Sequence, residues 1–292
     1  MSVYANLVPF SGSLAALLNQ WFFSLPFAFW LLVLIMAFIA IASYVTKQLT
    51  LGGSIAAFLV GFIPTWILGF GALVSFMLFF ISAGVLGKLA KRMGASNPDK
   101  IQKKGGCRDS IQVFANGGMA LLCAIIYAFA PSPITLVMFG AGIGEAASDT
   151  FAGEVGILSK SKPVSIITGK PMKPGLSGAV SGLGTASGML GAVLIGLCWM
   201  GSFLPLTLTS VFYASVVSIG SFFGCIMDSV LGATVQAHYY DEEKDLLTEH
   251  PEVEGKKLPL VRGIRWIDND VVNLMSNVIA VMLAGSLALV LG

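Results

Sequence analysis

The hydrophobic positions of the chain fall into long unbroken runs. A membrane-spanning helix needs about 20 predominantly apolar residues, and the sequence meets this requirement eight times. The expected helices cover residues 26–46, 49–69, 70–90, 110–130, 134–157, 177–199, 208–237 and 270–291. The apolar stretch 11–23 is too short to span, so we interpret it as an interfacial or re-entrant segment. The pattern predicts an all-α, polytopic transmembrane helix bundle that forms one integral membrane domain over residues 1–292.

The positively charged residues occur only in alternate connections between these helices. All 17 Lys and Arg residues lie at 47, 88–108, 160–173 and 244–265, and the connections near Gly69, Ser132 and Gly201 have none. Because Lys and Arg collect on the cytoplasmic side of short loops, we expect these four connections to be cytoplasmic and both termini to lie outside. The connection 238–269 mixes both charge signs with Pro and Gly, which predicts a solvated, partly flexible cytoplasmic loop without chemistry.

The composition agrees with lipid as the solvent. The chain is 56% hydrophobic and 11% charged, against roughly 25% charged in a soluble domain. Its net charge of +2 is too small to indicate a nucleic-acid partner. The four cysteines are scattered singly, which predicts packing rather than a disulfide framework or a zinc site. The two histidines, His238 and His250, lie in the 238–269 connection and are assigned no role.

Three polar residues begin the helix expected at 110–130. Arg108, Gln112 and Asn116 recur every four residues and therefore form one stripe on the helix. Polar caps and an interhelical amide contact explain one such group more readily than three aligned ones. We interpret the stripe as a substrate-binding surface.

Three carboxylates end the helix expected at 134–157. Glu145, Asp149 and Glu154 lie in a segment that is otherwise apolar enough to span, and ionisable groups at membrane depth usually mark function. Asp149 and Glu154 are about 140° apart on a regular helix. They could hold one cation only if Gly153 lets the helix break or a partner helix closes the gap. Hard oxygen ligands favour Mg²⁺. The alternative is a carboxylate paired with a loop lysine.

The loop 166–178 resembles an anion-binding loop in composition. Glycine allows backbone N–H groups to turn toward an anion, and the start of a helix adds favourable partial charge. Lys170 and Lys173 could contact phosphate, with Gly175, Ser177 and Gly178 supplying the loop. An ordinary Gly/Pro turn is the alternative. The glycines that follow in the helix 177–199 indicate close helix packing.

Further polar groups lie at the same side of the membrane in the last two helices. Asp228, Gly232 and Gln236 share one face, as do Asp270, Asn273 and Asn277, although Asp270 alone could be a helix cap. We expect Asp228 or Asp270 to complete the metal site with Asp149 and Glu154.

Five ordered segments carry a resemblance that extends over nearly the whole chain. They are KKGGCRDSIQVFANGG, SDTFAGEVG, the Gly/Pro loop, DSVLGATVQ and IDNDVVNLMSN. The chain resembles the membrane proteins grouped as domain of unknown function ninety-two, a family that includes a plant phytyl-phosphate kinase. The family usually reads Gly-Asp-Thr-Trp-Ala-Ser-Glu where this chain has residues 148–154, and Gly-Thr-Asn-Gly where it has residues 175–178. The acidic pair is kept.

The resemblance implies a CTP-dependent kinase that converts an isoprenoid monophosphate, such as phytyl or geranylgeranyl phosphate, to the diphosphate with Mg²⁺. It implies roles for residues that the family's motifs occupy, namely Asn116, Asp149, Glu154, Asp228, Asp270 and Asn273. Two other classes stay open. A secondary transporter would use buried carboxylates near the bilayer midplane. A non-catalytic membrane protein that binds lipid phosphate would need the basic surface but not the acidic pair.

Geometry predicts where the substrates of such a kinase meet. A prenyl phosphate keeps its tail in hydrocarbon and its head group near the interface, whereas a nucleotide approaches from water. We therefore expect a pocket at the cytoplasmic end of the bundle, between the fourth, fifth, seventh and eighth helices and under the loop 168–178.

Overall fold

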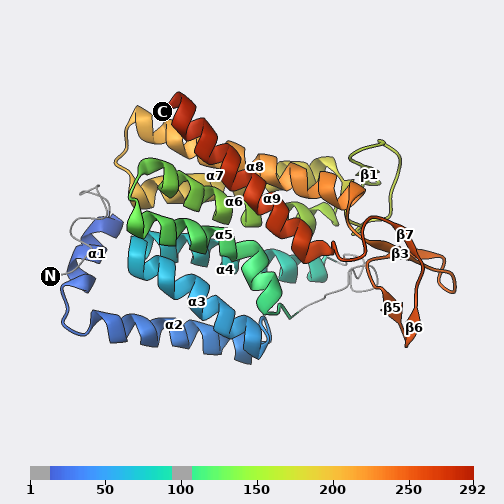
Figure 1. Ribbon diagram of the computed structural model, residues 1–292, viewed down its shortest axis with the longest axis horizontal. Coiled ribbons are helices and arrows are strands. Elements are labelled where there is room, and N and C mark those ends of the chain that lie inside the picture. The colour runs from blue at the N-terminus through green and yellow to red at the C-terminus, as the bar shows by residue number, and fades with distance from the viewer. Residues whose placement is uncertain (1–13, 94–106) are drawn as a thin grey trace.

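The computed structural model describes residues 14–93 and 107–292 and shows a bundle of long helices with small β-sheets at one end (Figure 1). The short helix α1 (Leu14–Phe23) precedes eight helices of 18 to 27 residues within those ranges. These are α2 (Ala28–Val45), α3 (Leu51–Leu68), α4 (Phe70–Arg92), α5 (Ser110–Phe129), α6 (Pro133–Gly156), α7 (Gly182–Phe203), α8 (Leu208–Thr234) and α9 (Asn269–Leu291). The predicted polytopic helical bundle is confirmed.

Seven of these eight helices are long and apolar enough to cross a membrane. The exception is α6, which contains the three carboxylates. One predicted boundary was wrong, because α7 begins at Gly182 and not at residue 177. Residues 179–180 instead form a strand, and the side chain of Ser181 caps the helix by accepting a hydrogen bond from Gly184 N at 3.1 Å.

The two ends of the bundle differ in character. Helix α1 and the C-terminal end of α9 lie at one end, and the strands lie at the other, which we call the sheet end (Figure 1). The connections after α2, α4, α6 and α8 are at the sheet end and, together with the last turns of α4, contain the Lys and Arg residues of the described chain. Lys100, Lys103 and Lys104 fall outside the described residues. That the sheet end is cytoplasmic stays a prediction.

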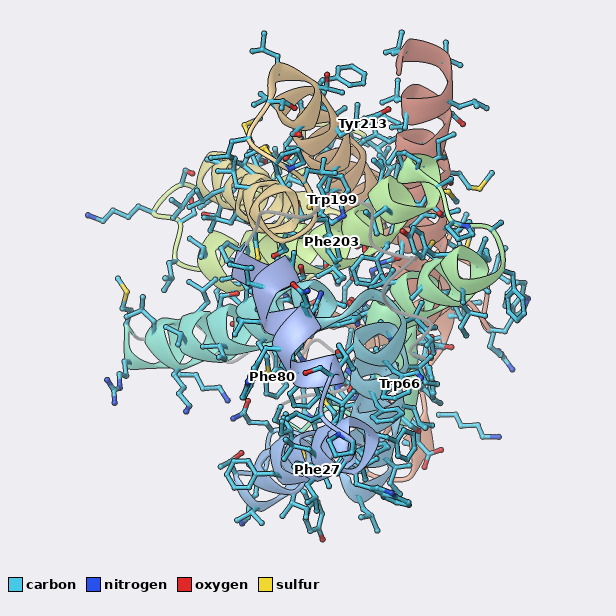
Figure 2. All side chains as sticks on the ribbon, turned by 90° about the vertical axis from the view of Figure 1, so that its left-hand side faces the viewer. Phe27, Trp66, Phe80, Trp199, Phe203 and Tyr213 are labelled. Atoms are coloured by element: carbon cyan, nitrogen blue, oxygen red, sulfur yellow. The ribbon has the colours of Figure 1, made fainter. Side chains whose placement is uncertain are left out.

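Helix α6 is the centre of the bundle, and α4, α5, α7, α8 and α9 pack around it. Small residues allow this position, since a Cβ added at Gly140 would lie 2.7 Å from the ring of Trp199. The indole nitrogen of Trp199 donates a hydrogen bond to Leu136 O at 2.9 Å. Trp199 and Phe203, labelled in Figure 2, belong to the largest buried cluster together with Phe139 of α6. A crowded centre of this kind fixes α6 relative to its neighbours.

The predicted glycine packing occurs between α6 and α7. A Cβ added at Gly184 would lie 2.9 Å from Ala152 O, and one at Gly188 would lie 3.2 Å from Ser148 O. The Ser148 hydroxyl donates to Gly188 O at 2.8 Å. The two backbones therefore approach closely along one face of α7, as small residues permit in membrane bundles.

A smaller aromatic cluster joins α1 to α2, α3 and α4 at the end opposite the sheets. Phe22 packs edge-on against Phe70, and Phe23 packs against Trp66, the latter labelled in Figure 2. The Asn19 side chain accepts a hydrogen bond from Phe70 N at 2.7 Å, which caps α4. Helix α1 has 10 residues and is too short to span. Of the predicted short segment 11–23, residues 11–13 lie outside the described residues.

The connection 238–269 contains five short strands, whereas the sequence predicted a solvated, partly flexible loop. Strands β3 (His238–Asp241), β4 (Leu246–Thr248) and β7 (Leu260–Arg262) form an antiparallel sheet in the order β4-β3-β7. Between β4 and β7, a hairpin of β5 (Glu252–Val253) and β6 (Lys256–Lys257) turns through Glu254 and Gly255, both with positive φ. Such turns match the twist of paired strands. We call this segment the β-domain.

Buried polar side chains hold the β-domain together. The His238 ring donates from Nδ1 to Gln236 O at 2.9 Å, and Arg262 Nη2 lies 3.3 Å from Nε2. Burial and the charge of Arg262 lower the pKa of His238 to about 4, so the ring is neutral at pH 7. His238 therefore has a structural role.

All four cysteines of the chain are free thiols.

Candidate functional site

A cavity of about 1150 Å³ lies at the sheet end of the bundle. Residues of α4, α5, α6, α8 and α9 line it, together with the loop after α6 and parts of the β-domain. It contains every predicted site residue except Lys170 and Lys173. These lining residues are Arg108, Gln112, Asn116, Asp149, Glu154, Gly175, Ser177, Gly178, Asp228, Asp270 and Asn273. Predicted site residues that are far apart in the sequence therefore line one space. Residues of α4, of the start of α7 and of the connection after α2 also line it.

Arg108 is fixed by its backbone at the start of α5. Its N–H donates to Gln48 O at 3.0 Å, and its carbonyl accepts from Thr50 N at 3.0 Å. A Cβ added at Gly53 would lie 2.4 Å from Arg108 O, so glycine is required for this approach. Burial lowers the pKa of Arg108, and the negative charges of Glu154 and Asp149 act in the opposite direction. The guanidinium thus faces the acidic end of α6.

The other two residues of the α5 stripe are partly used for structure. Gln112 forms a capping box with Asp109, since Gln112 Oε1 accepts from Asp109 N at 3.1 Å and Asp109 Oδ1 accepts from Gln112 N at 3.0 Å. Asn116 Nδ2 donates to Gln112 O at 2.9 Å. The capping alternative is therefore correct for Gln112, while the Asn116 carboxamide oxygen at the cavity wall is left for a ligand donor.

The two predicted metal-ligating carboxylates of α6 lie on one unbroken helix, and both lie near Arg108. The helix continues through Gly153 to Gly156, so the break that would let Asp149 and Glu154 converge is not seen. Glu154 lies against α4, where a Cβ added at Gly87 would be 3.4 Å from its carboxylate oxygens. Lys91 also attracts it. The alternative was a carboxylate paired with a loop lysine, whereas the lysine near Glu154 belongs to the last turn of α4; both carboxylates line the cavity.

Asp228 belongs to a buried polar network that extends toward the centre of the bundle. With the Asn273 amide turned so that its nitrogen faces acceptors, Asn273 Nδ2 donates to Asp228 Oδ2 at 3.0 Å. The Ser276 hydroxyl lies 3.2 Å from Asp228 Oδ2 and 2.7 Å from Glu145 Oε1. Asn277 Nδ2 donates to Glu145 Oε2 at 2.7 Å. These contacts orient Asp228 at the wall, while Glu145 is 1% exposed and lies behind it.

At the start of α9 the cap is Asp268, whose carboxylate accepts from Val271 N at 3.3 Å. Asp270, which could have been the cap from sequence alone, is buried in the first turn and lines the cavity. The N-terminus of α9 therefore meets the cavity with two carboxylates.

The loop before α7 packs tightly onto α8. Gly175 and Gly178 both have a φ of 85°, which an L side chain rarely adopts. A Cβ added at Gly178 would lie 2.5 Å from the Ala233 Cβ, and one at Gly232 would lie 3.2 Å from Gly178 N. Residues 177–178 therefore pack directly against Gly232 of α8, where a larger side chain would collide with them.

Ser177 joins this loop to the β-domain. Its hydroxyl donates to Glu249 Oε1 at 2.5 Å. Burial raises the pKa of Glu249 to about 7, hydrogen bonding from Ser177 opposes the rise, and the nearby Asp268 adds to it. The β-domain thus contributes to the cavity wall a carboxylate whose pKa lies well above its ordinary value.

Lys170 and Lys173 lie outside the cavity wall. The Lys173 ammonium donates to Asp245 O at 3.0 Å, toward a turn of the β-domain. The cations at the wall are instead Lys47, Lys88, Lys91, Arg108, Lys257 and Arg265. Lys88 and Lys91 are three residues apart at the end of α4, so they project from one face of that helix. The spacing of Lys88 and Lys91 can be read from the sequence, but both follow a long apolar run and were therefore interpreted only as the charged end of a spanning helix.

The β-domain adds lining residues that sequence reasoning missed. Tyr239, Glu249, Glu252 and Lys257 all line the cavity. In the sequence they belong to a segment of mixed charge with Pro and Gly, which is typical of a solvated loop. The pairing of β3 with β4 and β7, together with the β5–β6 hairpin, places these side chains at the cavity wall.

The carboxylate set fits a cation that arrives with its substrate rather than a preformed metal cage. Within residues 14–93 and 107–292, no three His, Cys, Asp or Glu side chains are close enough to hold one metal ion. Magnesium usually keeps several waters and binds through one or two carboxylates plus substrate phosphates. Asp149 and Asp228 line the cavity on neighbouring α6 and α8, and both are oxygen donors of the kind that such binding needs.

Comparison with known proteins decides the family. The sequence profile of the family described as integral membrane protein DUF92 matches residues 2–281. This chain belongs to that family. Protein PGR of Arabidopsis thaliana is 30% identical over 266 residues, covering 84% of this chain and 90% of that protein. An uncharacterized membrane protein of Methanocaldococcus jannaschii is 33% identical over 201 residues, covering 69% of this chain and 80% of its own.

A third relative, an uncharacterized membrane protein of Synechocystis, is 29% identical over 225 residues, covering 74% of this chain and 84% of its own. No solved structure matches the chain. The family and these relatives agree with the helices in making the protein an integral, multi-pass membrane protein.

Proposed function

We propose that this protein is a membrane kinase that transfers a phosphoryl group from a nucleoside triphosphate, CTP by the resemblance, to an isoprenoid monophosphate such as phytyl or geranylgeranyl phosphate. The cavity of about 1150 Å³ at the sheet end carries this proposal. A pocket for one ligand usually has a volume of roughly 300–1,000 Å³. The cavity is larger than that, and it joins helix ends at the membrane surface to the β-domain. Two substrates of different polarity fit such a place.

The charges of the wall suit phosphoryl transfer. In the proposed reaction a phosphate oxygen of the monophosphate attacks the γ-phosphorus of the nucleotide, and the bond from that phosphorus to the bridging oxygen breaks. The products are the prenyl diphosphate and a nucleoside diphosphate. Lys88, Lys91 and Arg108 would neutralise phosphate charge, and backbone N–H groups of residues 175–178 would contact it.

The attacking group needs no strong base. A phosphate monoester has a second pKa of about 6 and is already ionised at neutral pH. This agrees with a described cavity wall that contains no histidine. Asn116 and Asn273 would orient phosphate oxygens through their amides, and Asp228 would be held in place by Asn273 and Ser276.

Magnesium, when bound, would neutralise negative charge on the phosphates. Asp149 and Asp228 would hold the ion. Asp270, in the first turn of α9 at the same cavity, would be a further oxygen donor. Glu154 would keep Arg108 and Lys91 in place, because it lies beside both cations.

A secondary transporter is the second candidate, and the buried Glu145 network favours it. Glu145, Ser276 and Asn277 form the kind of buried polar cluster on which coupling ions bind. Transport also requires access from both ends of the bundle. Most of the residues that line the large cavity lie in the connections at the sheet end or on the adjoining halves of the helices, and the described wall reaches as far as Phe80 of α4 and Phe222 of α8. The kinase therefore accounts for more of the observed geometry than the transporter does.

A direct assay tests the proposal. Purified protein in lipid nanodiscs is incubated with each of the four γ-labelled nucleoside triphosphates and a panel of prenyl monophosphates, and the lipid products are separated. We expect label in the diphosphate with at least one pair and dependence on Mg²⁺. Label in no product, with the same protein instead moving a prenyl phosphate or an ion across a sealed vesicle, would contradict the kinase.

A further inference from the structure

A second cavity, of about 110 Å³, lies between α2, α3, α4 and α5. Its wall includes Ile39 from α2, Ala57 from α3, Met77 from α4 and Val113 from α5. The remaining wall is also apolar, apart from four polar residues. An apolar space of this kind stays dry and binds apolar groups.

The apolar cavity adjoins the large one at a defined place. Phe80, Arg108, Gln112 and Asn116 line both cavities. Arg108 is thus at a boundary, with the acidic end of α6 on one side and hydrocarbon side chains on the other. A ligand that crosses this boundary must carry a charged group, matched to Arg108, at one end and an apolar chain at the other.

We propose that the cavity between α2 and α5 holds the first five-carbon unit of the substrate's hydrocarbon chain, next to the phosphate. This inference rests on the proposed kinase function and adds to it the place of the chain. A cavity of about 150 Å³ holds a benzene ring. A volume of about 110 Å³ therefore fits one five-carbon unit, and the rest of the chain extends into lipid.

Helices α2 to α4 thereby gain a function that the polar segments of the sequence do not assign to them. Most of the carboxylates and amides of the site come from α5, α6, α8 and α9, while α2 and α3 contribute apolar side chains. The chain and the phosphate would lie on either side of Arg108, and the nucleotide would approach from the β-domain.

Photolabelling tests this placement. The probe is a ten-carbon prenyl monophosphate with a diazirine on the five-carbon unit next to the phosphate, applied to wild-type protein in nanodiscs and mapped by mass spectrometry. We expect label on peptides of α2, α3 or α4 that contain Ile39, Ala57 or Met77. Unlabelled prenyl monophosphate should compete it away.

A matched pair of variants sharpens the test. Ala57→Leu fills the cavity, and Ala40→Leu adds the same side chain to a half-buried position of α2 that does not line it. We expect Ala57→Leu to reduce labelling roughly tenfold or more, because the lost burial of several methylene groups is large, and Ala40→Leu to leave it unchanged. Should Ala57→Leu fail to fold, the wild-type label map decides.

The outcomes separate the two proposals. Label confined to α7 or α8, no label, or equal labelling of Ala57→Leu and wild type would refute the chain site. Diphosphate formation by wild type together with one of those results would keep the kinase and reject the chain site. Label at α2 to α4 with no turnover for any nucleotide would keep the chain site and reject the kinase.

Discussion

Replacing Glu249 by glutamine should change how the stability of the protein depends on pH. Glu249 is 5% exposed, lies at the edge of the cavity and accepts the Ser177 hydroxyl. Burial raises its pKa from 4.5 to about 7. Glutamine has nearly the same shape, can still accept from Ser177 through its oxygen, and does not ionise. The substitution therefore removes the titration while it keeps the contact.

The sign and size of the stability difference between wild type and Glu249→Gln follow from the raised pKa of Glu249. The folded state binds the Glu249 proton more tightly than the unfolded state, so the wild type loses stability as pH rises from about 4.5 to about 7 and changes little from this group beyond. One pKa unit corresponds to about 1.36 kcal/mol, so the difference between 4.5 and about 7 amounts to roughly 3 kcal/mol. Glu249→Gln should be the more stable protein above pH 7, by up to that amount.

The assay is the free energy of unfolding of both proteins in mixed micelles, measured at intervals from pH 4.5 to pH 8. The difference between them isolates Glu249, because the other buried carboxylates are common to both. The control is Glu243→Gln, which removes an exposed carboxylate bonded to Lys256 at 2.8 Å and should leave the profile within about 0.5 kcal/mol of wild type. Parallel profiles for wild type and Glu249→Gln would refute the reasoning.

Three other predictions concern the fold. Gly178→Ala should destabilise by about 1–3 kcal/mol more than Gly169→Ala in denaturant unfolding, because both have positive φ but only Gly178 would press against α8; equal effects would contradict the seating of the loop. Gly184→Ala should lower stability by about 1–3 kcal/mol while Gly182→Ala, with open space around it, should not; a stabilised Gly184→Ala protein would contradict close α6–α7 packing. In a Cys107→Ser background, a cysteine replacing Lys162 should react with an impermeant thiol reagent only from the cytoplasmic side, and reaction only from outside would reverse the orientation.

The helices could be predicted from the sequence because the membrane imposes one simple requirement. Each run of about 20 apolar residues became a helix within a few residues of its expected ends, and the largest error was at α7. There Gly178 and Ser181 decide the start, through a positive φ and an N-cap, and hydropathy does not report either.

Most of the cavity could also be predicted, since polar groups are rare in so apolar a chain and the ends of antiparallel helices meet. Arg108, Asp149 and Asp228 were each conspicuous for this reason. Lys170 and Lys173 were named on loop composition, yet the pairing of β1 (Val164–Ser165) with β2 (Ala179–Val180) places them away from the cavity wall.

The β-domain could not be foreseen, because its strands are two to four residues long and its charges look solvated. Glu249 owes its environment to burial and to contacts such as the one with Ser177, 72 residues away in the sequence. Tertiary pairing of this kind leaves no periodic pattern in the sequence, so side chains such as Tyr239 and Glu249 were missed as lining residues.

The most direct test of the central claim is phosphoryl transfer by Asp149→Asn, compared with wild type and with Glu242→Gln in the exposed turn of the β-domain. Asp149 lies at the cavity wall on the central helix, and asparagine keeps its shape while it removes the charge that would hold Mg²⁺. With circular dichroism and elution unchanged, Asp149→Asn should lose at least roughly a hundredfold in labelled prenyl diphosphate formed per minute, and Glu242→Gln should equal wild type. Full turnover by a folded Asp149→Asn protein would contradict the assignment of phosphoryl transfer to this cavity.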